Sequence, residues 1–232
     1  MVMTDQSAQP VVIEVNIAAP IDTVWASLRD PALIKLWHGW EYDGLDAEID
    51  QIYIAGADAD DEAQVLQVDG GDRFELEDQG DEIVVRITRP VLGPEDEGVD
   101  YFDDITQGWI SFLQQLKFMH ELHPDRPRRT LFFSDRGDPD ALLALVSSTP
   151  RLLGQRWFST EHQDGIMLPD LGPGLLITAT KEVTAGEHAG AAVDAMAIIS
   201  TYGMDEETFR RHEAEWTEWW RSGFQAVPDA EV

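Results

Sequence analysis

The chain contains no cysteine among its 232 residues. Disulfide bonds, thiolate nucleophiles and cysteine-based metal sites are therefore excluded. Lysine is also scarce, since only Lys35, Lys117 and Lys181 occur among 16 basic residues, against 45 acidic ones. The formal net charge of -29 argues against nucleic acid and anionic membrane surfaces as partners, because both require basic patches. A salt-adapted protein and a high-GC coding bias both fit this composition.

Long apolar runs are missing too. No stretch approaches the length of a membrane span, so we expect no membrane insertion. Residues 1–10 are polar and lack an apolar core, which predicts that they are not a signal peptide and that the protein is cytoplasmic. The hydrophobic fraction of 43% and the eight tryptophans are sufficient for real cores. A chain of this length suits one large domain or two small ones.

The sequence is organised around a predicted amphipathic helix over residues 103–120. Its apolar face recurs at helical spacing and comprises Ile105, Trp109, Phe112, Leu113, Leu116 and His120. Asp100, Asp103 and Asp104 at its start suit the helix dipole. Pro124 ends the pattern. Such a face requires a sheet or another helix to pack against.

The residues before this helix predict a sheet. Residues 11–17 are Val- and Ile-rich and indicate a strand, Pro20 opens a helix over 21–29, and a second short helix ends at Trp37. Strands are then expected at 41–45, 48–55, 63–68, 73–77 and 83–88. Gly70-Gly71 favours a hairpin turn, the acidic run at 58–62 an exposed hairpin tip, and 91–99 a loop. Closely spaced strands of this kind indicate an antiparallel meander.

The residues after this helix repeat the same order. A linker rich in Pro and charge spans 123–129. Strands are expected at 130–133, 155–161, 165–168, 175–183 and 191–201, with a helix after Asp138-Pro139 and a final helix that Asp205-Glu206-Glu207 caps. We therefore predict an α+β fold with two units in tandem, at 10–122 and 126–226. The second unit is expected to be reduced, with fewer strands, and to be an eroded duplication of the first.

Three motifs in the first unit resemble the SRPBCC superfamily, also called START-like or birch-pollen-allergen-like. They are Ile17-Ala18-Ala19-Pro20-Ile21-Asp22-Thr23-Val24-Trp25, then Asp30-Pro31 with Trp37, and then Gln107-Gly108-Trp109-Ile110-Ser111-Phe112-Leu113-Gln114-Gln115-Leu116-Lys117. Within that superfamily the similarity is to the branch related to the activator of the Hsp90 ATPase. The second unit matches by element order only.

The resemblance implies a helix-grip fold, in which a curved antiparallel sheet surrounds the long C-terminal helix and an internal pocket. Members bind lipids, polyketides, hormones or other apolar molecules. Some are cyclases, aromatases or hydrolytic self-resistance proteins, and others are co-chaperones. The family has no universal catalytic residue, so the resemblance assigns none here, and a fold alone does not give a function.

The candidate ligand-binding residues follow from this picture. Trp109, Phe112, Leu113 and Leu116 are either plain core or the floor of a pocket. His38, beside Trp37, is expected near the pocket mouth as a ligand-orienting or acid/base group, or as a loop histidine bonded to backbone. His120 is either a polar group facing the cavity or a partner of the helix dipole. Tyr53 and Arg86 are expected in mid-strand, where an inward orientation depends on the strand register.

The motif search favours binding over chemistry. His120 and His123 lack a third metal ligand, and His212-Glu213 has no partner at ligand spacing, so no metal is predicted. No P-loop and no Gly-x-Ser-x-Gly elbow occurs, and no cofactor is expected. The leading hypothesis is binding of a small apolar molecule in the first unit. The alternatives are a cyclase- or aromatase-type enzyme that uses the same pocket, and a co-chaperone or interaction module with a protein partner.

Overall fold

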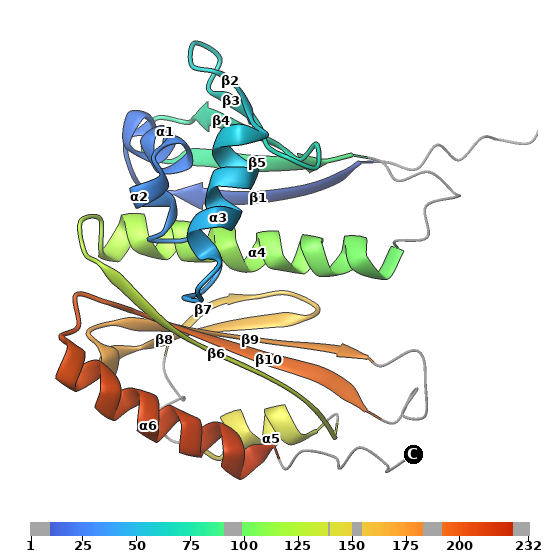
Figure 1. Ribbon diagram of the computed structural model, residues 1–232, viewed down its shortest axis with the longest axis vertical. Helices are drawn as coiled ribbons and strands as arrows, with labels where there is room; N and C mark the ends of the chain where they lie inside the picture. The colour runs from blue at the N-terminus through green and yellow to red at the C-terminus, as the bar shows by residue number, and fades with distance from the viewer. Residues whose placement is uncertain (1–9, 91–98, 139, 150–154, 183–191, 225–232) are drawn as a thin grey trace, which may run out of the picture. The chain divides into compact units, whose positions relative to one another are not determined.

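The computed structural model describes residues 10–90, 99–138, 140–149, 155–182 and 192–224, with only the backbone of 99–103. The chain divides into two compact units, Met1–Pro124 and Asp125–Val232, and this boundary falls in the predicted linker (Figure 1). The expected loop at 91–99, Pro139 and the end of the second predicted domain at 226 lie wholly or partly outside the described residues. No helix in these ranges is long and apolar enough to cross a membrane.

Unit 1 is built on an antiparallel sheet of five described strands in the order β1-β5-β4-β3-β2. The strands are β1 (Val11–Ile17), β2 (Asp58–Asp60), β3 (Val65–Gln67), β4 (Arg73–Asp78) and β5 (Ile83–Arg89). Gly70 and Gly71 both have positive φ and form the predicted turn between β3 and β4. The expected strands at 11–17, 63–68, 73–77 and 83–88 are confirmed to within two residues at each end.

Two other expected strands, at 41–45 and 48–55, are wrong. Residues 45–55 form the helix α3 (Leu45–Ile49), which continues as a π-helical segment, η1 (Asp50–Ala55). Their buried side chains are Leu45, Ile49 and Tyr53, four residues apart, which is a helical period. The alternation of isoleucine around Tyr53 resembles a strand, but Ile54 is exposed and only the fourfold spacing matches the burial.

The predicted central helix exists and is longer than expected. It is α4 (Val99–Leu122), and it runs along the sheet of unit 1 beside β1 (Figure 1). Two short helices, α1 (Ile21–Arg29) and α2 (Pro31–Ile34), follow β1. Leu113 and Leu116 on α4 are fully buried, and so are Phe74 and Ile87 of the sheet. The core of unit 1 therefore lies between α4 and the sheet.

Unit 2 repeats this plan with an identical strand order, β6-β10-β9-β8-β7. Its elements are β6 (Arg128–Gly137), α5 (Ala141–Ser147), β7 (Arg156–Ser159), β8 (Gln163–Leu168), η3 (Pro169–Leu171), β9 (Gly174–Glu182), β10 (Val193–Tyr202) and α6 (Glu206–Gly223). The described part has five strands, as in unit 1, so the expectation of fewer strands is wrong. In each unit the strand that comes first in the sequence pairs with the strand that comes last, so the two topologies are equivalent.

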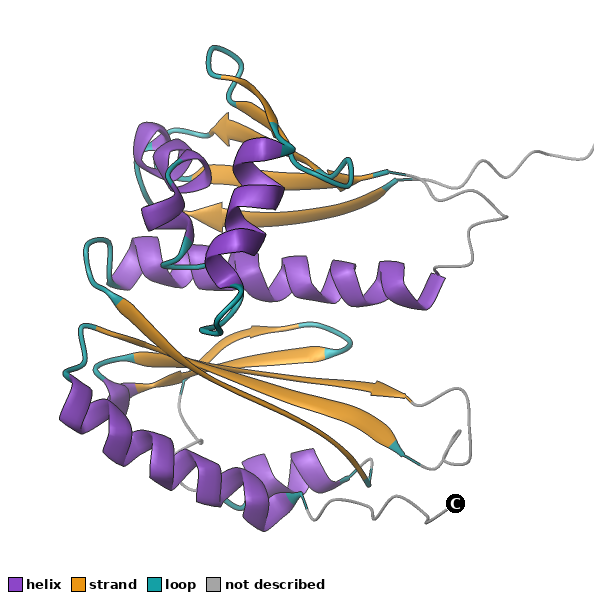
Figure 2. Ribbon diagram, in the orientation of Figure 1, coloured by secondary structure: helices purple, strands orange, loops and turns teal. Residues whose placement is uncertain are grey.

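The closing helix of unit 2 begins and packs as predicted. The Asp205 carboxylate accepts a hydrogen bond from the backbone N–H of Thr208, as an N-cap does. Trp216, Trp219 and Trp220 are buried in one cluster with side chains of α5 and the sheet. Each unit thus pairs an antiparallel sheet with a closing C-terminal helix (Figure 2). The α+β prediction of two helix-grip units in tandem is confirmed.

Candidate functional site

The interior of unit 1 holds a cluster of aromatic rings that includes most of the predicted site residues. Its members are Trp37, His38, Tyr53, Phe74, Trp109 and Phe112, whose contacting rings have centroid separations of 4.6–6.3 Å. Five of these rings are no more than 5% exposed, whereas Phe112 is half-buried. Phe112 lies closest to His38, at 4.6 Å. The cluster therefore reaches the surface at Phe112.

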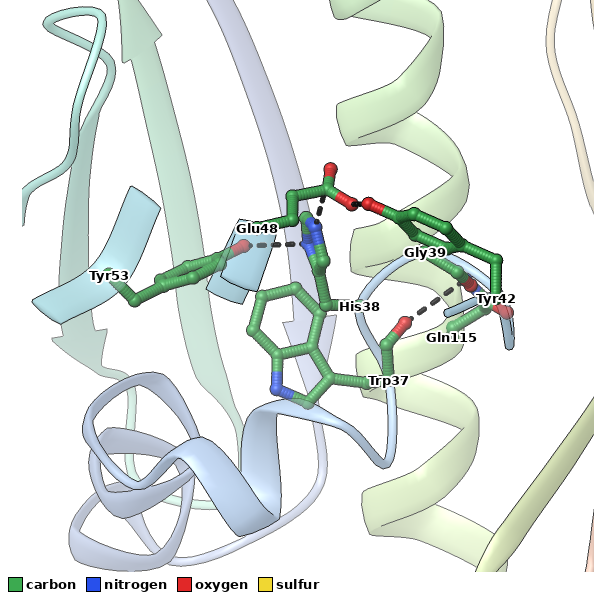
Figure 3. A network of polar contacts seen from close by, with 7 residues as sticks. All are labelled: Trp37, His38, Gly39, Tyr42, Glu48, Tyr53 and Gln115. Atoms are coloured by element: carbon green, nitrogen blue, oxygen red, sulfur yellow. Dashed lines mark hydrogen bonds and ion pairs between the residues drawn. The ribbon is translucent and has the colours of Figure 1, made fainter. Parts of the chain in front are cut away.

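A chain of polar groups crosses this cluster (Figure 3). The Tyr53 hydroxyl lies 2.9 Å from His38 Nδ1, and His38 Nε2 lies 3.4 Å from Glu48 Oε1. The Tyr42 hydroxyl donates to the other oxygen of Glu48. In a neutral His38 imidazole, an ionised Glu48 holds the ring proton on Nε2, so Nδ1 accepts from Tyr53. The chain connects the buried Tyr53 to Tyr42, which is 48% exposed.

The pKa shifts follow from these contacts. The hydrogen bond from His38 lowers the pKa of Glu48, and the bond from Tyr42 adds to this effect. Burial raises the pKa of Tyr53 well above its usual value, with help from the charge of Glu48. The bond to Glu48 raises the pKa of Tyr42 to about 12. At neutral pH Glu48 is therefore a carboxylate, and both phenols keep their protons.

The backbone around His38 is fixed by side chains from other elements. The Gln115 amide on α4 donates to the carbonyls of Trp37 (3.0 Å) and Gly39 (3.2 Å). The Trp37 indole N–H donates to the Ser27 carbonyl at 2.8 Å. Gly39 has a φ of 56°, which a glycine adopts without steric cost. These contacts hold the His38 ring in the interior, where it contacts the side chains of Tyr53 and Glu48.

Tyr53 owes its position to the π-helical segment η1. The Gly56 N–H donates to the Gln51 carbonyl five residues earlier, which is the π pattern. The Gln51 amide also donates to Asp69, and the Asp69 N–H donates to the Ile52 carbonyl, so the segment is bonded to the turn after β3. π-Helical turns are rare and occur frequently at functional sites. Here the π-helical turn positions the Tyr53 phenol within hydrogen-bond distance of the buried His38.

A second buried polar group lies on the other side of Trp109. The Asp72 carboxylate accepts from the Trp109 indole N–H at 2.6 Å and from Arg89 Nε at 3.0 Å. Arg89 also donates to the Thr106 hydroxyl at 2.6 Å. Both charged residues are at most 5% exposed. This group fixes the first turns of α4 on the sheet.

Sequence reasoning missed Glu48, Asp72 and Arg89. Arg89 shares the strand parity of Val85 and Ile87, which are fully buried, and that parity was the available signal. Arg86, a predicted site residue, has the opposite parity. It lies apart from the aromatic cluster and pairs with Glu14 and Glu77 on neighbouring strands.

The remaining predicted site residues extend along α4. Leu113 and Leu116 are fully buried, and His120 is 7% exposed one turn further on. Within the described ranges, no group of three or more His, Asp or Glu side chains is arranged to hold a metal ion.

The protein thus has an α+β fold of two units, and its first unit contains a buried chain of polar groups. No family model matches the sequence, and no curated protein matches it. The chain is similar to the structure of DynU16, a protein of the dynemicin biosynthetic locus, with a TM-score of 0.36 and 12% identity over 93% of this chain and 96% of that one. It is also similar to the di-domain ARO/CYC StfQ from the steffimycin pathway, with a TM-score of 0.35 and 13% identity over 92% and 95%. The function is therefore inferred from contacts within this chain.

Proposed function

We propose that unit 1 binds a small, largely apolar molecule carrying a hydroxyl group, in the interior between its sheet and α4. The observation that supports this most is the Tyr53–His38 hydrogen bond, which lies among aromatic rings. Tyr53 is 0% exposed and His38 is 1% exposed. Binding sites of this kind combine apolar and aromatic walls with a few placed polar groups. The rings would provide the apolar contact area and Tyr53 the polar contact.

The hydrogen-bond inventory defines what Tyr53 recognises. Its proton is engaged by His38 Nδ1, and its high pKa keeps the phenol protonated. The phenol oxygen retains acceptor capacity. A ligand that donates a hydrogen bond, such as a phenol or alcohol, therefore fits better than a ligand that only accepts one.

Entry requires a ring to move, and Phe112 is the ring placed to do so. It is the half-buried member of the cluster and packs directly on His38. Gly108 lies one turn earlier on α4 and has no side chain. A Cβ added there would lie 3.8 Å from the Phe112 ring, an ordinary van der Waals contact. Rotation of Phe112 would open a path from the surface to His38 and Tyr53.

Isothermal titration calorimetry with two probes tests this proposal. We expect the protein to bind 4-hydroxystilbene about fivefold more tightly than trans-stilbene, because one additional hydrogen bond contributes about 1 kcal/mol. Tyr53→Phe should abolish that preference, and Phe112→Ala should accelerate association in stopped-flow measurements. Phe133→Ala, a matched change in unit 2, should alter neither. Absence of binding of both probes to both the wild type and Phe112→Ala would refute the proposal.

A second candidate is acid/base chemistry on a bound carbonyl compound, as in a cyclase or aromatase. The specific observation in its favour is the Glu48–His38 contact of 3.4 Å, because a carboxylate beside an imidazole raises its basicity and orients it. In such a reaction, a base of this chain would remove the proton α to the carbonyl while a hydroxyl hydrogen-bonds to the developing enolate oxygen.

The exchange of α-protons for deuterium separates this candidate from simple binding. The methyl protons of 2-acetonaphthone in D₂O should exchange faster with the protein than in buffer, as followed by NMR. His38→Leu should remove the acceleration, and Glu48→Gln should reduce it and shift its pH profile. Exchange at the buffer rate, with retained stilbene binding, would leave the binding function alone.

Other expectations from the sequence remain proposals. A co-chaperone or interaction role, from the resemblance to the Hsp90 ATPase activator branch, predicts capture of a protein partner by the full chain. A cytoplasmic location is likewise a proposal from the sequence. The charge of -29 favours a partner with a basic surface if a protein partner exists.

A further inference from the structure

His120 is a buried histidine with an unpartnered ring nitrogen. Its side chain is 7% exposed, and Nε2 has no hydrogen-bond partner in the described protein. An unsatisfied buried polar atom costs about 1–3 kcal/mol, so native proteins seldom keep one without a reason. Burial lowers the pKa of His120 to about 4, and Glu121 opposes this only in part. The imidazole is therefore neutral at physiological pH.

The position of His120 along α4 is well defined. It follows Trp109, Leu113 and Leu116 at intervals of four, three and four residues, so all four lie on one helix face. Trp109 on that face contacts Phe74 of β4 and Asp72, which directly precedes β4. His120 therefore faces the same interior, beyond an aliphatic stretch.

The helix end that carries His120 is bonded to the end of β1. The Lys117 ammonium donates to the Asn16 carbonyl and to Glu121 Oε1, and Glu121 accepts from the Ala18 backbone N–H. Residues before and after His120 in the sequence, Lys117 and Glu121, thus attach the last turn of α4 to the end of β1. The missing hydrogen bond is not a consequence of a frayed helix end.

Other buried polar side chains on α4 have partners. The Gln115 amide bonds two backbone carbonyls, and the Trp109 N–H bonds Asp72. Phe112, which packs on His38, precedes His120 by eight residues, or about 12 Å at the rise of an α-helix. The interior of unit 1 therefore has two polar ends with Leu113 and Leu116 between them.

We propose that His120 is a ligand-binding residue, and that unit 1 takes an elongated apolar molecule with a hydrogen-bonding group at each end. One end bonds Tyr53 and the other bonds His120 Nε2. This inference rests on the proposed function and narrows it to a ligand class: rigid or extended apolar molecules with a hydroxyl or phenol group at each end. A neutral imidazole nitrogen can donate or accept, so it suits a hydroxyl.

Calorimetric titration with 4-hydroxystilbene and 4,4′-dihydroxystilbene tests this. We expect the wild type to bind the dihydroxy probe about fivefold more tightly, since the second hydroxyl gains one hydrogen bond. His120→Leu should remove that gain while retaining the preference of 4-hydroxystilbene over trans-stilbene. The ligand-free His120→Leu protein should be at least as stable as wild type, because it loses an unsatisfied polar atom. A histidine with a structural bond would instead destabilise the protein when replaced.

His123→Leu serves as the control. His123 is also buried near the end of α4, but its ring packs on Phe118 at 5.7 Å. This variant should keep the preference for the second hydroxyl. Equal affinities of the two phenols for the wild type would overturn the assignment of His120 while leaving the proposed function intact. If neither phenol binds, the proposed function fails first. If His120→Leu keeps the full gain, the second hydroxyl contacts another group and the assignment is wrong.

Discussion

The two units have the same strand order but different interiors. The interior of unit 1 contains the chain from Tyr53 through His38 to Glu48, and also His120, whose Nε2 has no hydrogen-bond partner in the described protein. The cluster in unit 2 consists of aliphatic side chains together with Phe209, Trp216, Trp219, Trp220 and Phe224. Unit 2 also buries polar side chains, such as Gln163 and Ser200. The difference is that the ring cluster of unit 1 contains a histidine bonded to a tyrosine, whereas the cluster of unit 2 is built from apolar side chains and tryptophans.

The two units also fix their closing helices by one shared device. In unit 1 the Trp109 N–H donates to Asp72 at 2.6 Å, and in unit 2 the Trp220 N–H donates to Asp135 at 2.6 Å. Asp72 is buried and paired with Arg89, whereas Asp135 is half-buried. The same bond is thus part of a buried ion pair in unit 1 and a simpler contact in unit 2.

The largest expected effect comes from removing Asp72. Asp72→Ala would leave the Arg89 guanidinium and the Trp109 N–H buried without their carboxylate, at a cost of about 3–5 kcal/mol. Urea unfolding followed by hydrogen-exchange mass spectrometry should locate the loss in β4, β5 and α4. Losses below 1 kcal/mol would mean that the ion pair is effectively solvated.

The second largest effect is expected from acidification, through His120 in unit 1. The folded-state pKa of His120 is about 4, below its unfolded value of 6.5, so its titration leaves the free energy of unfolding unchanged above pH 6.5 and lowers it as the pH falls from 6.5 towards 4. The full loss is about 3 kcal/mol. The free energy of unfolding of the wild type minus that of His120→Leu, measured between pH 7 and 4, isolates this residue from the many carboxylates. A pH-independent difference would contradict the burial of a neutral imidazole.

Breaking the polar chain should have a smaller effect. His38→Leu would leave the fully buried Tyr53 hydroxyl without its partner, at a cost of about 2 kcal/mol. The double variant with Tyr53→Phe should recover part of this loss, because both polar partners are then gone. Strictly additive losses in the double-mutant cycle would show that the two side chains are not coupled.

The smallest effect is expected at the corresponding bond of unit 2. Asp135→Ala removes the acceptor of one indole N–H, and the Trp220 ring remains stacked on Phe224 at 4.5 Å. We expect a loss of about 1 kcal/mol, confined to unit 2 in hydrogen exchange. A loss equal to that of Asp72→Ala would remove the energetic distinction between the units.

The sequence was sufficient for the element order because apolar periodicity and turn residues are local signals. Asp205, Gly70 and Gly71 do what their positions predicted. Residues 45–55 were mistaken for strands, since Ile52, Tyr53 and Ile54 alternate with a β period over a short stretch. The helical spacing of Leu45, Ile49 and Tyr53 extends over a longer window and decided the outcome.

The site was only partly predictable, for a different reason. The aromatic residues and His38 are recognisable from their type and position, but their partners come from remote parts of the chain. Glu48 meets His38 only because 45–55 is helical, and Asp72 meets Arg89 only through the register of β4 and β5. Arg86 lies one residue out of the inward parity and pairs with Glu14 instead. Register and helix type are tertiary outcomes that one sequence does not fix.

The central claim is that the ligand site lies in unit 1, around the Tyr53–His38 pair. Hydrogen-exchange mass spectrometry of the full chain, with and without saturating 4-hydroxystilbene, tests it most directly. We predict slower exchange at residues 37–56 and along 108–120, with β8, β9 and β10 unchanged. Protection confined to unit 2, or no protection in either unit, would contradict the claim.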